Sequence, residues 1–383
     1  MGAQAVSFPY PKHYLRIAVS TVFFLPGIIF ASWASRIATI QQTLNLSDAA
    51  LGGILFCIPV GLIISLPVAG WLISRIGSRM LVLLGISAYA VGLVGLGWAP
   101  NVPLLMACMV GFGFASNSVN IAVNTQAVAT EKLYNKPIMA SFHGLWSLAG
   151  FAGAGIGTFM IGKNILPLYH FALMTAIVLV ILFVSYRYLL NDKGPAETRQ
   201  GFVMPDRPLI KLGIIAFCSL ICEGAMFDWS VIYFKKVLHA HNGWMGAGYT
   251  VFMCTMAMGR FIADWFAHRF GLKQTLQISG LLTAVGLLIA VIFPQIPTAM
   301  IGFLLVGFGV SSVVPMIYSV AGKSKTMSPG MALAAVSTIG FVGFLVGPPV
   351  IGFVAGLFNL RVSFILIAVM GLCVTGISSK VKI

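Results

Sequence analysis

Three carboxylates of this sequence, Glu223, Asp228 and Asp264, stand inside or beside long apolar runs, where a charge is hard to place. A charged side chain at mid-membrane depth costs at least about 2.5–3.5 kcal/mol, so such residues usually face a cavity or a partner. Glu223 lies deepest in its run, and loss of water there favours the protonated carboxyl. Glu223 and Asp228 are therefore our candidates for proton coupling. The alternative for Glu223 is a neutral carboxyl that is hydrogen-bonded between helices.

Spacing limits which of these charges can meet. Glu223 and Asp228 are five residues apart, which is about 140° of helix rotation, so their carboxyls cannot form one tight pair. Arg260 and Asp264 are four residues apart, the spacing of an ion pair within one helix. Arg260 could instead meet Glu223 or Asp228 on a neighbouring helix. We expect gating or ion-pair roles for five charged residues: Arg75, Arg79, Arg260, Asp264 and Arg269.

Three asparagines could provide a polar surface for a hydroxylated ligand. Asn117, Asn120 and Asn124 follow i, i+3, i+7 spacing, which places three amides on one helix face. An amide offers both donors and acceptors, as a sugar or polyol requires. We expect these residues to line a substrate site. The alternative is hydrogen bonding between helices, a common role of Asn in membrane bundles.

A second polar face combines an imidazole with an indole. His143, Trp146 and Ser147 stand at i, i+3, i+4 spacing, and an indole beside polar groups suits stacking on a sugar. His can also titrate near neutral pH, although a structural His is the alternative. Trp33 and Arg36 could line the outer vestibule of such a site or anchor their helix at the headgroup level. We predict His143, Trp146, Trp33 and Arg36 as further substrate-binding residues.

Motifs for other chemistry are missing from the sequence. The six cysteines lie in apolar runs, and Cys218 with Cys222 lacks the further Cys or His that a metal site needs. No Gly-x4-Gly-Lys-Ser/Thr loop is present to bind ATP, and no nucleophile stands beside a base. The sequence therefore predicts no metal, no cofactor and no enzyme.

The composition shows what must position these residues. Of the 383 residues, 59% are hydrophobic and 8% are charged, whereas a soluble domain has roughly 25% charged residues. Lipid must therefore be the main solvent of this chain. The net charge of +15 comes from Lys and Arg residues that are scattered singly or in pairs. This pattern argues against nucleic-acid binding, which needs a clustered basic surface.

Long apolar runs predict an all-α integral membrane protein with twelve transmembrane helices in two six-helix, pseudo-symmetric bundles. A span needs about 20 apolar residues, and only helices suit these runs because unpaired backbone groups are too costly in lipid. We expect bundles at residues 1–190 and 209–383 and a cytoplasmic linker at 191–208. Ser47 and Asp48 read as a cap before the second span. The spans are predicted at residues 14–37, 49–73, 80–99, 103–128, 138–162, 167–189, 209–234, 245–266, 274–293, 298–321, 330–354 and 360–379.

Basic residues predict the orientation. Seventeen of the 23 Lys and Arg residues fall in the termini and the loops on their side, five fall on the opposite side, and Arg260 lies within a span. By the positive-inside rule, both termini are cytoplasmic, and we expect the cell (inner) membrane. The first apolar run reaches about Arg36, which is too long for the core of a signal peptide, so it reads as an uncleaved first span.

The two halves of the sequence repeat each other. Segment 70–79, after the second span, matches segment 264–273, after the eighth, with Arg, Gly and a final basic residue in register. Gly-Phe-Gly at 111–113 recurs at 307–309, and the spaced Ser and Gly residues of 147–157 recur in 337–347. Three matches in chain order indicate an internal duplication. The small residues of the last pair also predict close helix packing.

The loop motif carries a family resemblance. Residues 70–79 follow the pattern Gly-x3-Asp-Arg-x-Gly-x-Arg, with Gly70, Arg75, Gly77 and Arg79 in place and Ser74 at the position of the acid. Over essentially its whole length the chain resembles the major facilitator superfamily. Four strings are similar to the YbjJ-like, fucose-permease-related branch: His-Gly-Leu-Trp-Ser-Leu at 143–148, Asp-Trp-Ser at 228–230, Met-Gly-Arg-Phe at 258–261 and Gly-Pro-Pro at 347–349.

The resemblance implies secondary transport by alternating access, in which two bundles rock around a site near the membrane midplane. We expect a monomeric symporter that takes up a small polar solute, such as a sugar or a sugar derivative, together with protons. One alternative is a proton-driven exporter of amphipathic compounds, which the 28 Phe and 18 Met residues would suit. The other is a non-transporting membrane sensor.

Overall fold

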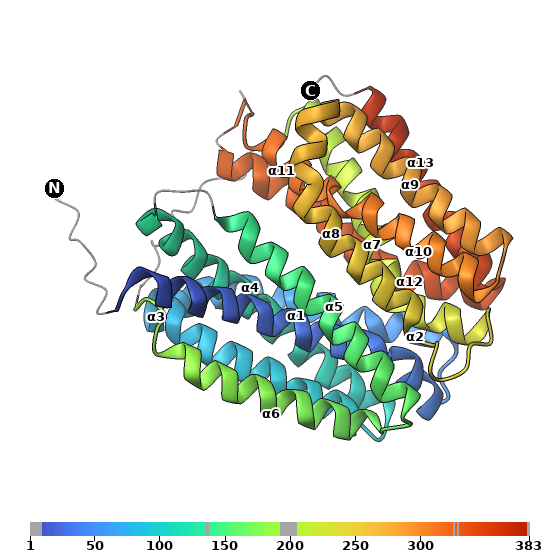
Figure 1. Cartoon of the computed structure of the whole chain (residues 1–383), viewed down its shortest axis with the longest axis horizontal. Helices are drawn as coiled ribbons and strands as arrows, with labels where there is room; N and C mark the ends of the chain where they lie inside the picture. The colour runs from blue at the N-terminus through green and yellow to red at the C-terminus, as the bar shows by residue number, and fades with distance from the viewer. Residues whose placement is uncertain (1–9, 135–137, 192–204, 325, 328, 381–383) are drawn as a thin grey trace.

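The structure, a computed structural model, describes residues 10–134, 138–191, 205–324, 326–327 and 329–380. Within these ranges every regular element is a helix, and the helices form two groups, α1–α6 and α7–α13 (Figure 1), which we call the N-terminal half and the C-terminal half. The predicted linker at 191–208 lies mostly outside the described residues, so a domain boundary there stays a prediction. The helices are α1 Lys12–Thr43, α2 Asp48–Leu55, α3 Cys57–Trp98, α4 Val102–Tyr134, α5 Met139–Gly162, α6 Pro167–Tyr186, α7 Arg207–Lys236, α8 Ala247–Phe270, α9 Leu272–Ile292, α10 Ile296–Ser311, α11 Val313–Ala321, α12 Pro329–Leu357 and α13 Leu360–Ser379.

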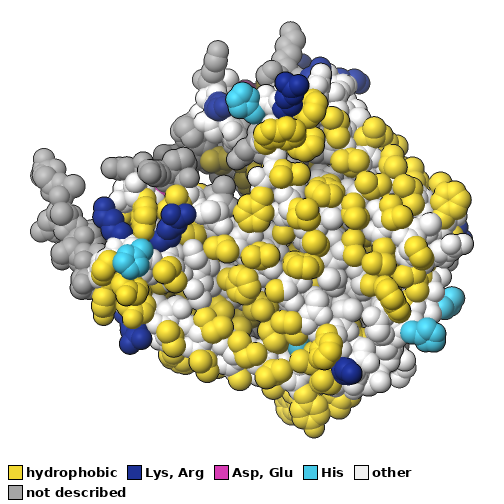
Figure 2. Space-filling view, in the orientation of Figure 1, with side chains coloured by type: hydrophobic (Ala, Val, Ile, Leu, Met, Phe, Trp, Pro, Cys, Tyr) yellow, Lys and Arg dark blue, Asp and Glu magenta, His cyan; other side chains and the backbone are white. Residues whose placement is uncertain are grey.

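Ten helical stretches in the described part of the chain are long and apolar enough to span a membrane. One of them, Asp48–Trp98, turns at Gly77 and therefore contains two spans. Helix α8 is not among these ten stretches and carries Arg260 and Arg269, but with 24 residues it is long enough to span a membrane. All twelve predicted spans therefore lie on helices. Figure 2 shows hydrophobic side chains over the middle of one face and Lys and Arg side chains at its margins, as contact with lipid requires.

Prolines explain two interruptions that the apolar pattern did not predict. The second span breaks at Phe56, between α2 and α3, and the tenth breaks at Ser312, between α10 and α11. In each case a proline, Pro59 or Pro315, follows three residues later. Proline has no backbone N–H, and its ring clashes with the preceding turn, so it interrupts or kinks a helix.

The two halves repeat each other in backbone geometry. Gly77 follows the second span with φ 82° and ψ 157°, and Gly271, at the matching point after the eighth, has φ 78° and ψ 154°. Glycine adopts this conformation readily, whereas a side chain would strain it. Gly153 packs on the backbone of α1, and Gly343 packs on that of α7: an added Cβ would lie 3.1 and 2.5 Å from carbonyl oxygens. The predicted pseudo-symmetry and close packing are present in the fold.

Contacts between the halves concentrate at one end of the helices, which we call the latched end. There α2 packs on α12, and a Cβ added to Gly52 would lie 2.7 Å from the carbonyl oxygen of Pro348. Helix α5 packs along α8, with Gly162 facing Gly243. From this end the two groups of helices diverge (Figure 1) toward the end at which α1 begins and α13 ends, which we call the terminal end.

Candidate functional site

Arg260 joins the two halves about midway along their helices. Its Nη2 lies 3.2 Å from Oε1 of Glu223 on α7, and its Nη1 donates to Oγ of Ser147 on α5 over 2.7 Å. The Glu223 side chain is only 7% exposed, and removing one member of a buried ion pair typically costs about 3–5 kcal/mol. Among the partners that the sequence left open for Arg260, the structure pairs it with Glu223. The side chain of Asp264 lies outside the described residues.

An aromatic wall adjoins this ion pair. The guanidinium of Arg260 lies 5.6 Å from the centre of the Trp146 ring, within the range of a cation–π contact. Phe30 of α1 stacks on the same indole at 6.3 Å and meets Phe227 edge-on at 5.1 Å. Phe227 in turn stacks on Phe344 of α12 at 6.2 Å. Helices of both halves thus build one wall, and Trp146, Phe30 and Phe344 are partly exposed on it.

The predicted face of α5 turns toward Arg260. Trp146 and Ser147 contact its guanidinium directly, and His143, one turn away, interacts with it electrostatically. His143 is exposed, and its ring meets Phe23 edge-on at 5.4 Å. The sequence identified this face but not its partner on α8.

Asp228 belongs to a different cluster from Glu223, as the spacing of the two carboxyls requires. It is half-buried, and Tyr249 of α8 lies within electrostatic range of it and of Tyr89 of α3. The Tyr249 hydroxyl and the indole N–H of Trp33 are buried without a hydrogen-bond partner among the described residues. The Tyr249 hydroxyl is therefore an unused donor within electrostatic range of the Asp228 carboxyl.

Arg36 is buried within the N-terminal half. It is 2% exposed, its Nε donates to Nδ1 of His170 on α6 over 3.2 Å, and its Nη2 has no hydrogen-bond partner among the described residues. Trp33, one turn earlier, is 1% exposed. Neither side chain lies at a surface, so the interpretation of Trp33 and Arg36 as headgroup anchors is wrong.

The three asparagines of α4 divide into two kinds. Asn117 is buried, and its Nδ2 donates to Oγ of Ser65 over 2.7 Å, which fastens α4 to α3. Asn124 donates through Nδ2 to Oδ1 of Asn120 over 3.0 Å, and Asn120 is exposed. Asn117 thus makes the interhelical bond that was the alternative, whereas Asn120 and Asn124 form an accessible polar surface.

The other predicted gating residues lie toward the terminal end. The Arg75 guanidinium lies 4.9 Å over the ring of Trp71, and Nη2 of Arg79 donates to the carbonyl oxygen of Arg187 over 3.4 Å. Arg269 is exposed. These arginines form no ion pair within the described residues, so their gating role stays a prediction.

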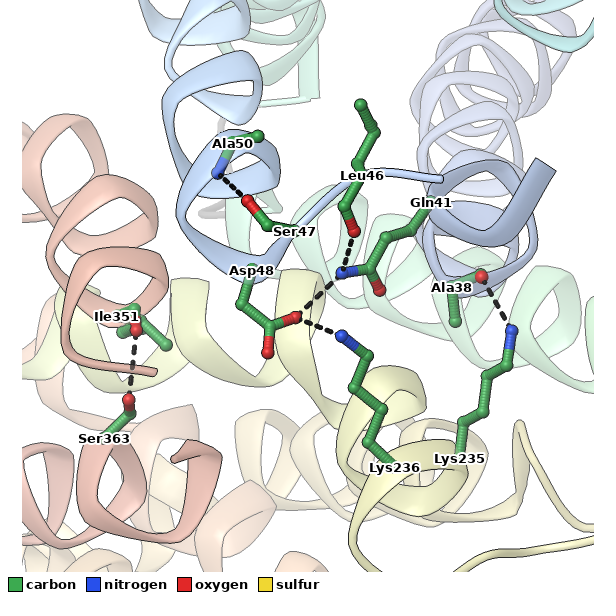
Figure 3. Close-up of polar contacts among 10 residues, drawn as sticks. All are labelled: Ala38, Gln41, Leu46, Ser47, Asp48, Ala50, Lys235, Lys236, Ile351 and Ser363. Atoms are coloured by element: carbon green, nitrogen blue, oxygen red, sulfur yellow. Dashed lines mark hydrogen bonds and ion pairs between the residues drawn. The ribbon is translucent and has the colours of Figure 1, made fainter. Parts of the chain in front are cut away.

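An ion pair that the sequence reasoning missed fastens the latched end (Figure 3). Oδ1 of Asp48 lies 2.5 Å from Nζ of Lys236 on α7 and also accepts from Nε2 of Gln41 over 2.8 Å. Beside it, Lys235 donates to Gln42 and to a carbonyl oxygen of α1. The sequence held a signal for this ion pair, because Asp48 is the only acid that the predicted topology places on the side of the membrane opposite the termini. Ser47 alone caps α2, accepting from a backbone N–H over 3.1 Å.

Comparison with known proteins identifies the class. A family model described as Major Facilitator Superfamily matches residues 18–324 and 239–378. The chain is 32% identical to an uncharacterised MFS-type transporter of Yersinia pestis over 94% of both chains. It is 31% identical to the membrane protein MosC of Rhizobium meliloti over 93% of this chain and 88% of that one. The chain therefore belongs to the major facilitator superfamily: it is a secondary transporter and not an enzyme.

Solved structures support the same fold. The nucleoside transporter NupG superimposes with a TM-score of 0.74 at 12% identity, covering 96% of this chain and 98% of that one. The human organic anion transporter MFSD10 superimposes with a TM-score of 0.67 at 16% identity, covering 96% and 100%. At such identities the likeness concerns the fold alone. Within the described residues, no cluster of three or more His, Cys, Asp and Glu side chains could hold a metal ion.

Proposed function

We propose that this transporter takes up a small polar solute together with a proton, and that Arg260 is the centre of its substrate site. The observation that carries the proposal is that one guanidinium holds Glu223 of its own half and Ser147 of the other half. A proton or a solute that changes either contact changes how the two halves are held together. Such a differential interaction with two conformations is what alternating access requires.

Charge balance links the proton to the solute. Arg260 and Glu223 neutralise each other at 3.2 Å. A proton on Glu223 would leave the guanidinium uncompensated, which is unfavourable inside a membrane. A solute oxygen that carries negative charge would restore the balance and suits the guanidinium well. We therefore propose as substrate a sugar or, more specifically, a sugar derivative that bears a carboxylate or phosphate group.

Accessible polar groups on α4 and α5 suit the rest of such a solute. His143 is exposed beside the ion pair, and Asn120 presents an exposed amide on α4. The Trp146 ring is already in contact with Arg260 and Phe30, so stacking on a sugar would require Phe30 to move. Asp228 is the second candidate for carrying a proton, because no cation pairs with it among the described residues.

Orientation follows from the positive-inside rule. The latched end carries Lys163, Lys235, Lys236 and Arg361, and it belongs to the side with few basic residues. We propose that this end faces away from the cytoplasm, that both termini are cytoplasmic, and that the described conformation opens to the cytoplasm.

The aromatic wall favours a second candidate, export of amphipathic compounds. Phe30 and Phe344, which are partly exposed and pack on the buried Phe227, offer apolar surface beside one ion pair. Such a surface would suit a ligand with a large ring system. The two candidates differ in direction and in ligand, so one assay separates them.

Uptake into proteoliposomes tests the proposal. The panel contains neutral sugars, sugar acids, sugar phosphates and amphipathic amines, each with and without an imposed pH gradient, acidic outside the vesicle. We expect the gradient to drive accumulation of a sugar acid or phosphate, and Arg260→Gln to abolish it. Arg187→Gln is the matched control, because that arginine is exposed at the terminal end. Equal accumulation with and without the gradient for every solute would overturn proton-coupled uptake, and unimpaired transport by Arg260→Gln would remove Arg260 from the site.

A further inference from the structure

A groove of about 580 Å³ opens between the halves at the latched end. The N-terminal half contributes Phe159 and Lys163, at the end of α5, and the C-terminal half contributes Trp244, Thr250 and Met300. The size is that of a small-molecule pocket. Phe159 is 60% exposed and Trp244 53%, so in a membrane the groove opens toward lipid.

Exposed aromatic residues at this end indicate that the mouth of the groove lies at the level of the lipid headgroups. Trp and Tyr favour that level because one edge of the ring is polar. Besides Trp244, Trp98 and Tyr169 are largely exposed at the same end of the molecule. Asn242 of the C-terminal half donates a hydrogen bond over 2.6 Å to Asn164 of the N-terminal half, the residue that follows Lys163 in the chain. Polar groups thus cover the outer edge of the groove.

Charge at the mouth points to a ligand class. Lys163 directly follows the last residue of α5, is exposed, and makes no ion pair within the described residues. Its Nζ lies 5.9 Å from the centre of the Phe159 ring. A Lys ammonium forms a charge-assisted hydrogen bond with a phosphate oxygen, so Lys163 at the edge of this apolar groove suits an anionic headgroup. We propose that this groove binds one anionic phospholipid, with an acyl chain along α5 and α8 and the phosphate on Lys163.

Such a lipid would stabilise the latched conformation. Oγ1 of Thr158 lies 3.0 Å from Oγ1 of Thr250, so the two walls of the groove are in direct contact. When the halves part at this end, the walls separate and the site is lost. A ligand that binds only one of two conformations shifts the equilibrium toward it. The lipid site does not depend on which solute is carried, nor on Arg260.

Lipid retention by the purified full-length protein tests the site. Native mass spectrometry after detergent exchange counts bound phosphatidylglycerol and bound phosphatidylcholine, each added alone. We expect Lys163→Gln to weaken phosphatidylglycerol binding by about fivefold, since one Lys near an anionic headgroup contributes roughly that much. Gly155→Leu should abolish retention of both lipids, because Gly155 lines the groove and an added Cβ there meets no atom within 4 Å.

Matched controls and a conformational readout complete the test. Lys132→Gln, at the terminal end, and Gly111→Leu, where an added Cβ also has open space, should retain lipid like the unaltered chain. Phosphatidylglycerol should also raise the rate at which a short cross-linker joins cysteines placed at Gln42 and Lys235, which meet only across the latched end. If Lys163→Gln and Gly155→Leu both retain as much phosphatidylglycerol as the unaltered chain, the proposed site is overturned. Loss of solute transport in Gly155→Leu with lipid retention intact would make the groove a solute passage and overturn it as well.

Discussion

The ion pair at the latched end predicts how easily that end opens. Asp48 and Lys236 belong to different halves and lie 2.5 Å apart (Figure 3). Asp48→Asn removes the charge but keeps the size of the side chain and an acceptor for Gln41, which donates to Asp48 over 2.8 Å. The variant therefore isolates the ionic part of the contact. We expect it to shift the protein toward the conformation that is open at this end.

The exposure of the two side chains sets the magnitude. Lys236 is 40% exposed and Asp48 16%, so water and salt screen the pair, and exposed pairs contribute about 0.2–1 kcal/mol. A loss at the upper limit changes the ratio of the two conformations by about fivefold. High ionic strength should shrink the difference between Asp48→Asn and the unaltered chain, because salt screens exposed charges.

Distances between spin labels measure the shift. Labels at Thr43 and His241, one in each half near the latched end, report the open and latched populations in a background without the six native cysteines. The charge-exchanged double variant, Asp48→Lys with Lys236→Asp, should recover at least part of the latched population. Lys211→Met, at the terminal end, should change nothing. If the exchanged variant opens as much as Asp48→Asn, or if salt has no effect, electrostatic attraction is not what holds this end.

Substitutions elsewhere test the site and the packing. Glu223→Gln should abolish gradient-driven accumulation in proteoliposomes while sparing exchange at equal concentrations, and unchanged accumulation would remove Glu223 from the coupling role. Asn117→Leu should destabilise the fold by roughly 1–3 kcal/mol, because it removes the hydrogen bonds that the Asn117 amide donates to Ser65 and to the carbonyl oxygen of Leu62 on α3. Asn120→Leu should keep the melting temperature and reduce transport, and the reverse pattern would contradict the placement of the two amides. Gly61→Val should lower the melting temperature, because an added Cβ lies 2.0 Å from a carbonyl oxygen of α4 and overpacking costs about 1–3 kcal/mol. Gly53→Val, where nothing lies within 4 Å, is its control, and equal melting temperatures would disprove the close contact.

The helices of this fold could be predicted because, in lipid, every long apolar segment of the sequence must form a membrane-spanning helix. Each apolar run had to be a helix, and the repeat placed Gly77 and Gly271 at matching points, where the structure gives both the same positive φ. The breaks at Phe56 and Ser312 were not predicted, although Pro59 and Pro315 provide a physical reason for them. Hydropathy averages over about 20 residues and does not register one interrupted turn.

Pairing between helices could not be predicted in the same way. Whether Arg260 meets Glu223 or Asp228 depends on the rotation of α7 and α8, and an apolar helix surface gives few constraints on rotation. For the same reason, the sequence did not predict that Arg36 donates a hydrogen bond to His170, which is 134 residues away. The cap predicted at Ser47 and Asp48 uses local spacing alone. The topology makes Asp48 the only acid on its side, but it does not say which basic residue the carboxylate meets. In the structure, the Asp48 carboxylate forms an ion pair with Lys236, which is 188 residues away.

The two ion pairs that the structure describes differ in exposure in the way that a carrier needs. The pair between Arg260 and Glu223 is largely buried, so a proton or a solute oxygen that enters it exchanges several kcal/mol of interaction. The pair between Asp48 and Lys236 is partly in water and contributes about 1 kcal/mol at most. Under the proposed function, a ligand bound at Arg260 therefore outweighs the ion pair at the latched end, whereas that ion pair does not outweigh the ligand. If the exposures were reversed, occupancy of the centre could not decide which end is open.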